Sequence, residues 1–306
     1  MKTKIILIAA FVLSVGFGGC DLLRKKVEKQ EETSYKFSSV TVKKIVVDNT
    51  NGDIEIMRSN DSTGITVKAI KEGKVKYSER DKPLENISVI VDSSNGVVSF
   101  KTEIKKSMGV FKKSDGGSVE FEIRVPKNVE VELSTTNGDI SMMNVPNAAK
   151  LNTVNGEILF ANAYGVYEAT SVNGSIVGNI DSTKGIELKT TNGSIKLGNM
   201  KNVSCEVNAS NVNGSIKYKD IEFRNLSSGK HSLSGTLNNG GAKIDVTTTN
   251  GSIRFQPAPF KVDRHRHGDF EFRFDFDDED EKIIEKKIIE EIKSKDNAKG
   301  SDSSKK

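Results

Sequence analysis

The dipeptide Asn-Gly recurs at a nearly constant spacing through the second half of the chain, each time between two short segments of alternating hydrophobicity. It occurs six times between residues 131 and 255, at Asn137-Gly138, Asn155-Gly156, Asn173-Gly174, Asn192-Gly193, Asn213-Gly214 and Asn250-Gly251. The first five Asn positions are 18, 18, 19 and 21 residues apart, and the last gap of 37 residues is about two such units. Such a period is typical of a solenoid, in which each unit buries its apolar face only against its neighbours.

Aligning the repeats on Asn places similar residues in the same column. The positions six and four before Asn, and three and five after it, are mostly apolar, with polar residues between them. The column three after Asn contains Ile140, Ile158, Ile176, Ile195, Ile216 and Ile253. Because strand side chains alternate between two faces, this pattern predicts two half-buried strands meeting at each Asn-Gly. A small polar residue two before Asn is suited to a hydrogen-bonded ladder beside the bend.

Asn-Gly is compatible with two architectures. Between antiparallel strands it forms a type I′ hairpin. In a stacked coil it is a corner, where Asn tolerates a left-handed backbone and Gly accepts the φ that the turn requires. Like residues every 18 to 21 positions favour the coil, because successive turns lie ~4.8 Å apart and like side chains stack. We therefore expect an all-β fold, a regular parallel β-solenoid over residues 127–260, with the six Asn-Gly pairs as structural corners.

The chain begins like a secreted bacterial protein. Residues 1–19 contain a short basic start, an apolar run and small residues, and Cys20 follows. The apolar run is too short to span a bilayer and is typical of a signal peptide. Its end resembles a lipobox, although Phe17 stands where Leu or Val is usual, and this resemblance implies cleavage before Cys20 and lipid attachment to it. The alternative is an ordinary signal with an incidental Cys. Residues 20–36 are expected to be a charged tether, disordered or partly helical.

Charge and cysteine content argue against nucleic-acid binding and against a disulfide-stabilised fold. The formal net charge of +4 falls by two when the two lysines of the signal peptide are removed. A chain so close to neutral lacks the basic surface that is typical of nucleic-acid-binding proteins. Cys205 is the second of two cysteines, so the mature chain has no intramolecular disulfide, and a buried apolar role is favoured for this thiol. The sequence contains no phosphate-cradling loop, Cys metal knuckle or Ser-His-Asp grouping. We expect no cofactor and no metal.

The regions beside the regular repeat are looser. Residues 37–126 contain Asn51-Gly52 and Asn95-Gly96 at about twice the solenoid spacing. We expect longer turns or antiparallel strands there that begin and cap the stack, since an uncovered sheet edge recruits other strands. The Gly-rich stretch 221–242 interrupts the period, which predicts a looped or distorted turn with His231 at the surface.

The end of the chain has its own pattern. Residues 261–296 are expected to form a Phe-rich strand and a short amphipathic helix, and residues 297–306 a disordered tail. The phenylalanines alternate with charged residues, so this apolar face either caps the solenoid or contacts another molecule. His265, His267 and Asp269 could contribute to a metal site, but the spacing fixes no third ligand, which favours a structural or solvated role.

Two outward columns of the solenoid are candidate sites. Four after Asn, Lys196, Lys217 and Arg254 form a basic strip suited to anionic polysaccharide, lipid headgroups or an envelope protein. Two after Asn, Asp139 and Glu157 lie on adjacent turns, and paired carboxylates are the groups that glycoside hydrolases use. Because that column continues as Ser, solvated corner residues explain it, and we expect no catalytic residue.

The repeated Thr/Val-Asn-Gly-Ser/Asp-Ile phrase, the segment Gly-Thr-Leu-Asn-Asn-Gly-Gly-Ala-Lys-Ile and the lipobox-like start resemble the Toastrack-type adhesin family of bacterial envelope proteins over about residues 40–256. The resemblance implies a β-solenoid outside the cytoplasm, in a family named adhesin largely by shape and sometimes linked to envelope-stress sensing. It supplies no catalytic motif. The expected function is non-enzymatic binding or scaffolding by a lipoprotein anchored to a membrane of the cell envelope, periplasmic or surface-exposed. The alternatives are an envelope-stress sensing accessory protein and a carbohydrate-active β-helix enzyme, a lyase or hydrolase.

Overall fold

The computed structural model describes residues 6–8, 26–79, 81–105, 117–145, 148–264 and 270–273. The chain divides into two units, Met1–Pro259 and Phe260–Lys306. The first unit contains two eleven-stranded sheets, here named sheet A and sheet B. The described residues outside strands include two single turns of 3-10 helix, η2 (Tyr77–Glu79) and η3 (Met200–Asn202). The all-β prediction is confirmed, and within the described ranges no helix is long and apolar enough to cross a membrane.

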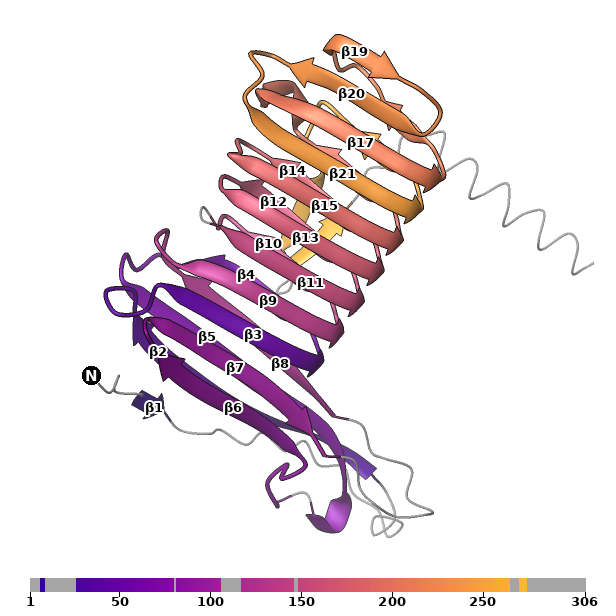
Figure 1. Ribbon diagram of the computed structural model, residues 1–306. Coiled ribbons are helices and arrows are strands. Elements are labelled where there is room, and N and C mark those ends of the chain that lie inside the picture. Colours follow the sequence, from indigo (N-terminus) through magenta and orange to yellow (C-terminus); the bar gives the residue numbers. More distant parts are fainter. Residues whose placement is uncertain are drawn as a thin grey trace, which may run out of the picture. The chain divides into compact units, whose positions relative to one another are not determined.

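Each repeat forms one rung, in which a strand of sheet B turns through Asn-Gly into a strand of sheet A (Figure 1). Neighbouring rungs pair in parallel and in register, so that Ile140 lies opposite Ile158 and Asn137 opposite Asn155. This confirms the predicted parallel β-solenoid. The rungs are β3 (Lys44–Asn51) with β4 (Ile54–Arg58), β9 (Glu130–Asn137) with β10 (Ile140–Met143), β11 (Ala149–Asn155) with β12 (Ile158–Ala163), β13 (Val166–Asn173) with β14 (Ile176–Ile180), β15 (Gly185–Asn192) with β16 (Ile195–Gly198), β17 (Cys205–Asn213) with β18 (Ile216–Tyr218), and β21 (Ala242–Asn250) with β22 (Ile253–Phe255).

The core lies between the two sheets and consists of stacked apolar rows. The isoleucines three after Asn in the interior rungs are at most 1% exposed. Burying one such side chain contributes roughly 1.5–3 kcal/mol, so four inward residues barely offset the entropy of ordering one rung, and only the stack is stable. Tyr218, which occupies an inward column, is 36% exposed because β18 is the last strand of sheet A.

The corners differ from the expected left-handed turn. None of the six repeat Asn residues has a positive φ, and among the six Gly residues only Gly214 does. Glycine is required instead by the close approach of adjacent rungs. A Cβ on Gly156 would lie 1.9 Å from the carbonyl oxygen of Gly138, and one on Gly174 would lie 1.8 Å from that of Gly156. No side chain fits in that space.

Side-chain hydrogen bonds run along the corner from rung to rung. Each Asn Nδ2 donates to the Asn Oδ1 of its neighbour at 2.7–2.9 Å, in the order Asn51, Asn137, Asn155, Asn173, Asn192, Asn250 and Asn213. Two residues earlier, Thr153 Oγ1 donates to the Gly138 carbonyl at 2.9 Å, and Thr190 Oγ1 to the Gly174 carbonyl at 2.9 Å. The predicted ladder of small polar residues is therefore present.

The rungs do not stack in chain order near the C-terminal end of the solenoid. The rung β21/β22 pairs with β15/β16 on one side and with β17/β18 on the other. Figure 1 shows it as an orange layer between two rungs that precede it in the chain. The expected distorted turn at 221–242 is instead a cap: β20 (Ser232–Leu237) pairs antiparallel with β17, and β19 (Arg224–Ser228) with β20. Asn238 then donates to the Val203 carbonyl at 2.8 Å, where the chain passes the start of β17.

The N-terminal end of the stack contains the same exchange. β7 (Val97–Ile104) and β8 (Gly117–Val125) pair in parallel with β3 and β4, outside the rung that precedes them in the chain. Antiparallel strands cover them: β6 (Ile87–Ser94) on β7, and β5 (Gly64–Lys76) on β8. Here Asn95-Gly96 closes the hairpin between β6 and β7, with φ of 50° and 78°, as a type I′ turn requires. Of the two alternatives expected here, longer turns or antiparallel strands that begin and cap the stack, the antiparallel capping strands are confirmed.

The expected tether at 20–36 is wrong from Lys26 onward. Strand β2 (Lys26–Ser38) pairs antiparallel with β5 along its whole length. Its charged residues meet partners across the sheet, as in the Lys68–Glu32 pair at 3.1 Å. On the other face Tyr35 and Phe37 are buried, with ring centroids 5.2 and 6.1 Å from that of Phe100. Alternation, which the high charge concealed, makes this segment a strand. β1 (Ile6–Ile8) pairs antiparallel with β2.

The second unit contributes one antiparallel pair, β23 (Lys261–Arg264) with β24 (Phe270–Arg273). β24 lies in the segment expected as a Phe-rich strand. The expected C-terminal helix, the tail at 297–306, Cys20 and the metal candidates His265, His267 and Asp269 lie outside the described residues.

Candidate functional site

The basic strip predicted from the repeat lies on three adjacent rungs. Lys196 on β16 is opposite Arg254 on β22, and Arg254 is opposite Lys217 on β18. The order along sheet A is therefore Lys196, Arg254, Lys217, and not the order of the chain. Lys217 is exposed, and the other two are half-buried. Three cations are thus repeated at the strand spacing of ~4.8 Å along one outward column.

The carboxylate column has a structural explanation. The backbone N–H of Glu157 donates to Asp139 Oδ1 at 2.7 Å, and the N–H of Asp139 donates to Asp53 Oδ1 at 2.8 Å. The later rungs make a similar contact with serine, since the N–H of Ser252 donates to Ser194 Oγ at 3.3 Å. A carboxylate or hydroxyl oxygen in this column therefore accepts the N–H of the next corner.

The electrostatics of Glu157 link this column to the basic strip. Partial desolvation raises the pKa of the Glu157 carboxyl, the neighbouring Asp139 raises this pKa further, and the ammonium of Lys196 opposes both. Glu157 therefore lies within the field of Lys196, although the rung β13/β14 separates the two residues.

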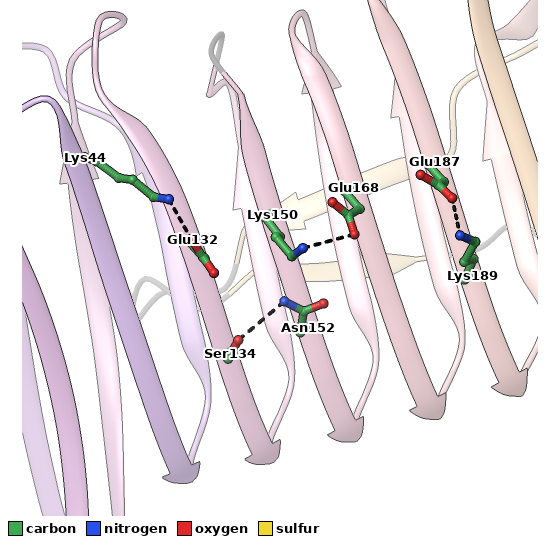
Figure 2. Close-up of polar contacts among 8 residues, drawn as sticks. All are labelled: Lys44, Glu132, Ser134, Lys150, Asn152, Glu168, Glu187 and Lys189. Carbon is green, nitrogen blue, oxygen red and sulfur yellow. Dashed lines mark hydrogen bonds and ion pairs between the residues drawn. The ribbon is translucent and has the colours of Figure 1, made fainter. Parts of the chain in front are cut away.

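Figure 2 shows the outer face of sheet B, where polar side chains contact each other along and across the rungs. The contacts are Lys44–Glu132 at 2.7 Å, Lys150–Glu168 at 3.2 Å, Asn152–Ser134 at 3.4 Å and the ion pair Lys189–Glu187. These side chains are largely solvated, so each ion pair contributes little to stability. Their main effect is to hold the charges of this face in fixed positions.

The same face is hollowed near the C-terminal cap. A hollow of ≈ 470 Å³ lies over β15, β21, β17, β20 and β19. Five of its lining residues have small hydroxyl side chains, and we name them the floor: Ser210, Ser227, Ser232, Ser234 and Thr247. Four others have longer polar side chains: Glu187, Lys189, Asn208 and Asp245. We name these nine residues the serine hollow.

The remaining single residues have structural roles. Cys205 is buried at the start of β17, and burial raises the pKa of its thiol to about 12. It is the expected small apolar residue. His231 is half-buried in the cap, with Nδ1 2.9 Å from Asn211 Oδ1, while its carbonyl accepts the N–H of Asn211 at 3.0 Å. Within the described residues, no group of three or more His, Cys, Asp and Glu could hold a metal ion.

Sequence reasoning missed a second corner column and the serine hollow. Seven after the repeat Asn, the residues Asn144, Asn162, Asn199 and Asp220 have φ of 55–64° and form the left-handed turns expected at Asn-Gly. Asn162 Nδ2 donates to Asn144 Oδ1 at 2.6 Å. The aligned repeats contain this signal, because Asn or Asp recurs at that position. The serine hollow left no periodic signal, since Ser227, Ser232 and Ser234 lie outside the repeat.

Fold and surface together define a capped parallel β-solenoid with ordered polar columns on both of its faces. The chain belongs to the Toastrack DUF4097 family, whose sequence model matches residues 82–256, more than half of its length. A search of curated proteins gave no match.

Several solved structures resemble this chain, among them the following three. A “putative cell adhesion protein” from Clostridium sporogenes is 10% identical, with a TM-score of 0.39, over 74% of this chain and 99% of that one. A “putative adhesin” from Bacteroides fragilis is 14% identical, with a TM-score of 0.40, over 73% and 96%. A “putative lipid binding protein” from Parabacteroides distasonis is 10% identical, with a TM-score of 0.33, over 73% and 96%. At these identities and scores the similarity carries no information on function.

Proposed function

We propose that this chain is a non-enzymatic, adhesin-like protein of the bacterial cell envelope, anchored to a membrane by lipid on Cys20. It binds anionic polysaccharide through Lys196, Arg254 and Lys217. The observation that supports the ligand class is the register of these three cations, which follow one another on adjacent rungs of sheet A. A polymer with regularly spaced anionic groups meets such a column at several points at once, and each further contact adds to binding without a new association cost.

The non-enzymatic part of the proposal is supported by the use of the paired carboxylates. Asp139 already accepts the N–H of Glu157, and Asp53 that of Asp139. A general acid or nucleophile needs its carboxyl oxygens free to approach the scissile bond from opposite sides. In this column Oδ1 of Asp53 and Oδ1 of Asp139 face the next corner instead.

Binding to polygalacturonate tests the basic strip. We expect the variant Lys196→Gln/Arg254→Gln/Lys217→Gln to bind roughly tenfold more weakly, since three ionic contacts at the surface, of about 0.5 kcal/mol each, are lost. Binding of the unchanged protein should weaken as salt rises, because exposed charges are screened. The matched control is Lys127→Gln/Lys184→Gln/Lys230→Gln, which removes the same charge from three exposed, scattered lysines. Equal losses of affinity in the two variants would mean that net charge, and not the arrangement of these three residues, determines binding.

The anchor is tested separately in a bacterial host. Metabolic labelling with an alkyne fatty acid should tag the protein and leave Cys20→Ser unlabelled and released from the membrane fraction. Labelling of both forms, or of neither, contradicts a lipid on Cys20. Incubating the protein with polygalacturonate and measuring new reducing ends tests the absence of catalysis. Cleavage that disappears in Asp139→Asn/Glu157→Gln would replace the binding proposal with an enzyme.

A further inference from the structure

The serine hollow lies on the same three rungs as the basic strip but on the opposite sheet. β15, β21 and β17 supply its solenoid side, and they continue through the corners into β16, β22 and β18. Its residues are neighbours in the sheet, since Ser210 is opposite Thr247 on one side and Ser232 on the other. In the same register Lys189 is opposite Thr247, and Glu187 is opposite Asp245, so small hydroxyl and longer charged side chains are neighbours in the hollow.

The floor of the hollow offers alternating donors and acceptors. Each hydroxyl supplies one donor and two acceptor positions, and the contacts inside the hollow use only part of this capacity. Ser210 Oγ lies 3.3 Å from Thr247 Oγ1, and Asn208 Nδ2 donates to Asp245 Oδ1 at 3.0 Å. These contacts hold the side chains in place before a ligand arrives, which lowers the entropy cost of binding.

The charges around the floor disfavour an anion. Lys189 is hydrogen-bonded to Glu187, which raises the pKa of its ammonium, and Glu168 and Asp245 add to this effect. The lining of the hollow contains one cation, Lys189, and two carboxylates, Glu187 and Asp245. The lining contains no aromatic residue and few apolar side chains, so an apolar ligand would leave the hydroxyls without partners.

We propose that the serine hollow binds a neutral glycan, which presents many hydroxyl groups and no negative charge. The volume of ≈ 470 Å³ falls within the range of about 300–1,000 Å³ usual for small-ligand sites and accommodates a short run of sugar units. The hollow and the basic strip lie on opposite sheets, so a glycan in the hollow leaves the strip uncovered. This site goes beyond the proposed function and does not depend on it.

Titration of the full chain with neutral hexasaccharides tests the hollow. The probes are maltohexaose, cellohexaose, laminarihexaose and chitohexaose, followed by backbone amide shifts. We expect at least one probe to shift the amides of residues 208–210, 232–234 and 245–247. Thr247→Val, which replaces one hydroxyl by a methyl group, should weaken that binding about fivefold to tenfold. Thr170→Val is the matched control, since Thr170 lies in the same outward column on β13, outside the hollow, and should bind normally.

Two further results decide the outcome. Ser210→Gln/Ser232→Gln fills the floor with longer polar side chains, and we expect it to abolish binding while the amide spectrum stays that of a folded protein. The basic-strip variant should bind the hexasaccharide as the unchanged protein does, which separates the two sites. The proposal is overturned if none of the four probes shifts these amides, or if Thr170→Val and Thr247→Val weaken binding equally.

Discussion

At the scale of single residues, most of the repeat corners require glycine because adjacent rungs leave no room for a side chain. A positive φ is not the reason, since among the six repeat glycines only Gly214 has one. The distance from an added Cβ to the carbonyl oxygen of the preceding rung is 1.9 Å at Gly156, and backbone cannot move aside as a side-chain end can. We expect Gly156→Ala to lower the free energy of unfolding by about 3 kcal/mol, the upper end of the usual overpacking range. Gly229→Ala is the control, because its Cβ would meet only Ser232 Oγ at 3.4 Å, and we expect a change within about 0.5 kcal/mol. Urea unfolding measures both, and a tolerated Gly156→Ala would contradict the close approach.

The buried thiol of Cys205 gives a residue-scale prediction about pH. Burial raises its pKa to about 12, against ~8.5 for an unfolded cysteine, so the thiolate fraction at pH 8 is lower by on the order of 1,000-fold. In a Cys20→Ser background, Ellman's reagent at pH 8 should react at least that much more slowly with native than with urea-unfolded protein. Stability should not depend on this group below pH ~8.5. It should fall as pH rises toward 12, because the unfolded state loses the proton first. Rapid native labelling would show that the start of β17 is open.

At the scale of elements, the corner ladder links one rung to the next. Asn155 takes part in two ladder bonds, donating to Asn137 and accepting from Asn173, whereas the terminal Asn213 donates one to Asn250. At a net value of about 0.5–1 kcal/mol for each exposed bond, Asn155→Ala should cost about 1–2 kcal/mol and Asn213→Ala about half as much. Urea unfolding of the two variants checks the ratio. Equal costs would mean that position in the ladder does not matter.

The elements themselves were predictable, but their order was not. Period-2 alternation around Asn-Gly identified the strands, because burial on one face leaves that pattern in any rung. This pattern could not identify which rungs lie next to each other, because the same apolar columns recur in every rung. The same limit applies to Asn95-Gly96: Ser93 and Val98 stand where corner repeats have a small polar residue and an Ile, yet the dipeptide closes a hairpin. The strip residues were predicted from one column, and their adjacency required the rung order.

At the scale of the solenoid as a whole, both ends combine an exchanged order of rungs with antiparallel capping strands. At each end the outermost strands, β7 with β8 and β17 with β18, are separated from a chain neighbour by another rung. Antiparallel strands cover β7, β8 and β17, while β18 remains the last strand of sheet A. A sheet edge made by a simple repeat would be open to another chain. At the N-terminal end the chain returns outside β3/β4 to form β7 and β8, and at the C-terminal end it forms β17/β18 and the cap before β21/β22 fills the position beside β15/β16. The serine hollow is a consequence, because cap strands β19 and β20 supply three of its serines.

This exchange predicts the order of folding at the C-terminal end. Both neighbours of β17 in sheet B, β20 and β21, come after it in the chain, so β17 has no native partner until residues 232–250 have folded. In pulse-labelled hydrogen exchange during refolding, we expect amides of 205–213 to gain protection together with those of 242–250. Both should follow 149–155 and 166–173, whose partners are local and whose loop closure is less costly. Protection of 205–213 before both 232–237 and 242–250 would mean that β17 first pairs with β15, in the rung before it in sequence. β21 would then have to displace an already formed rung.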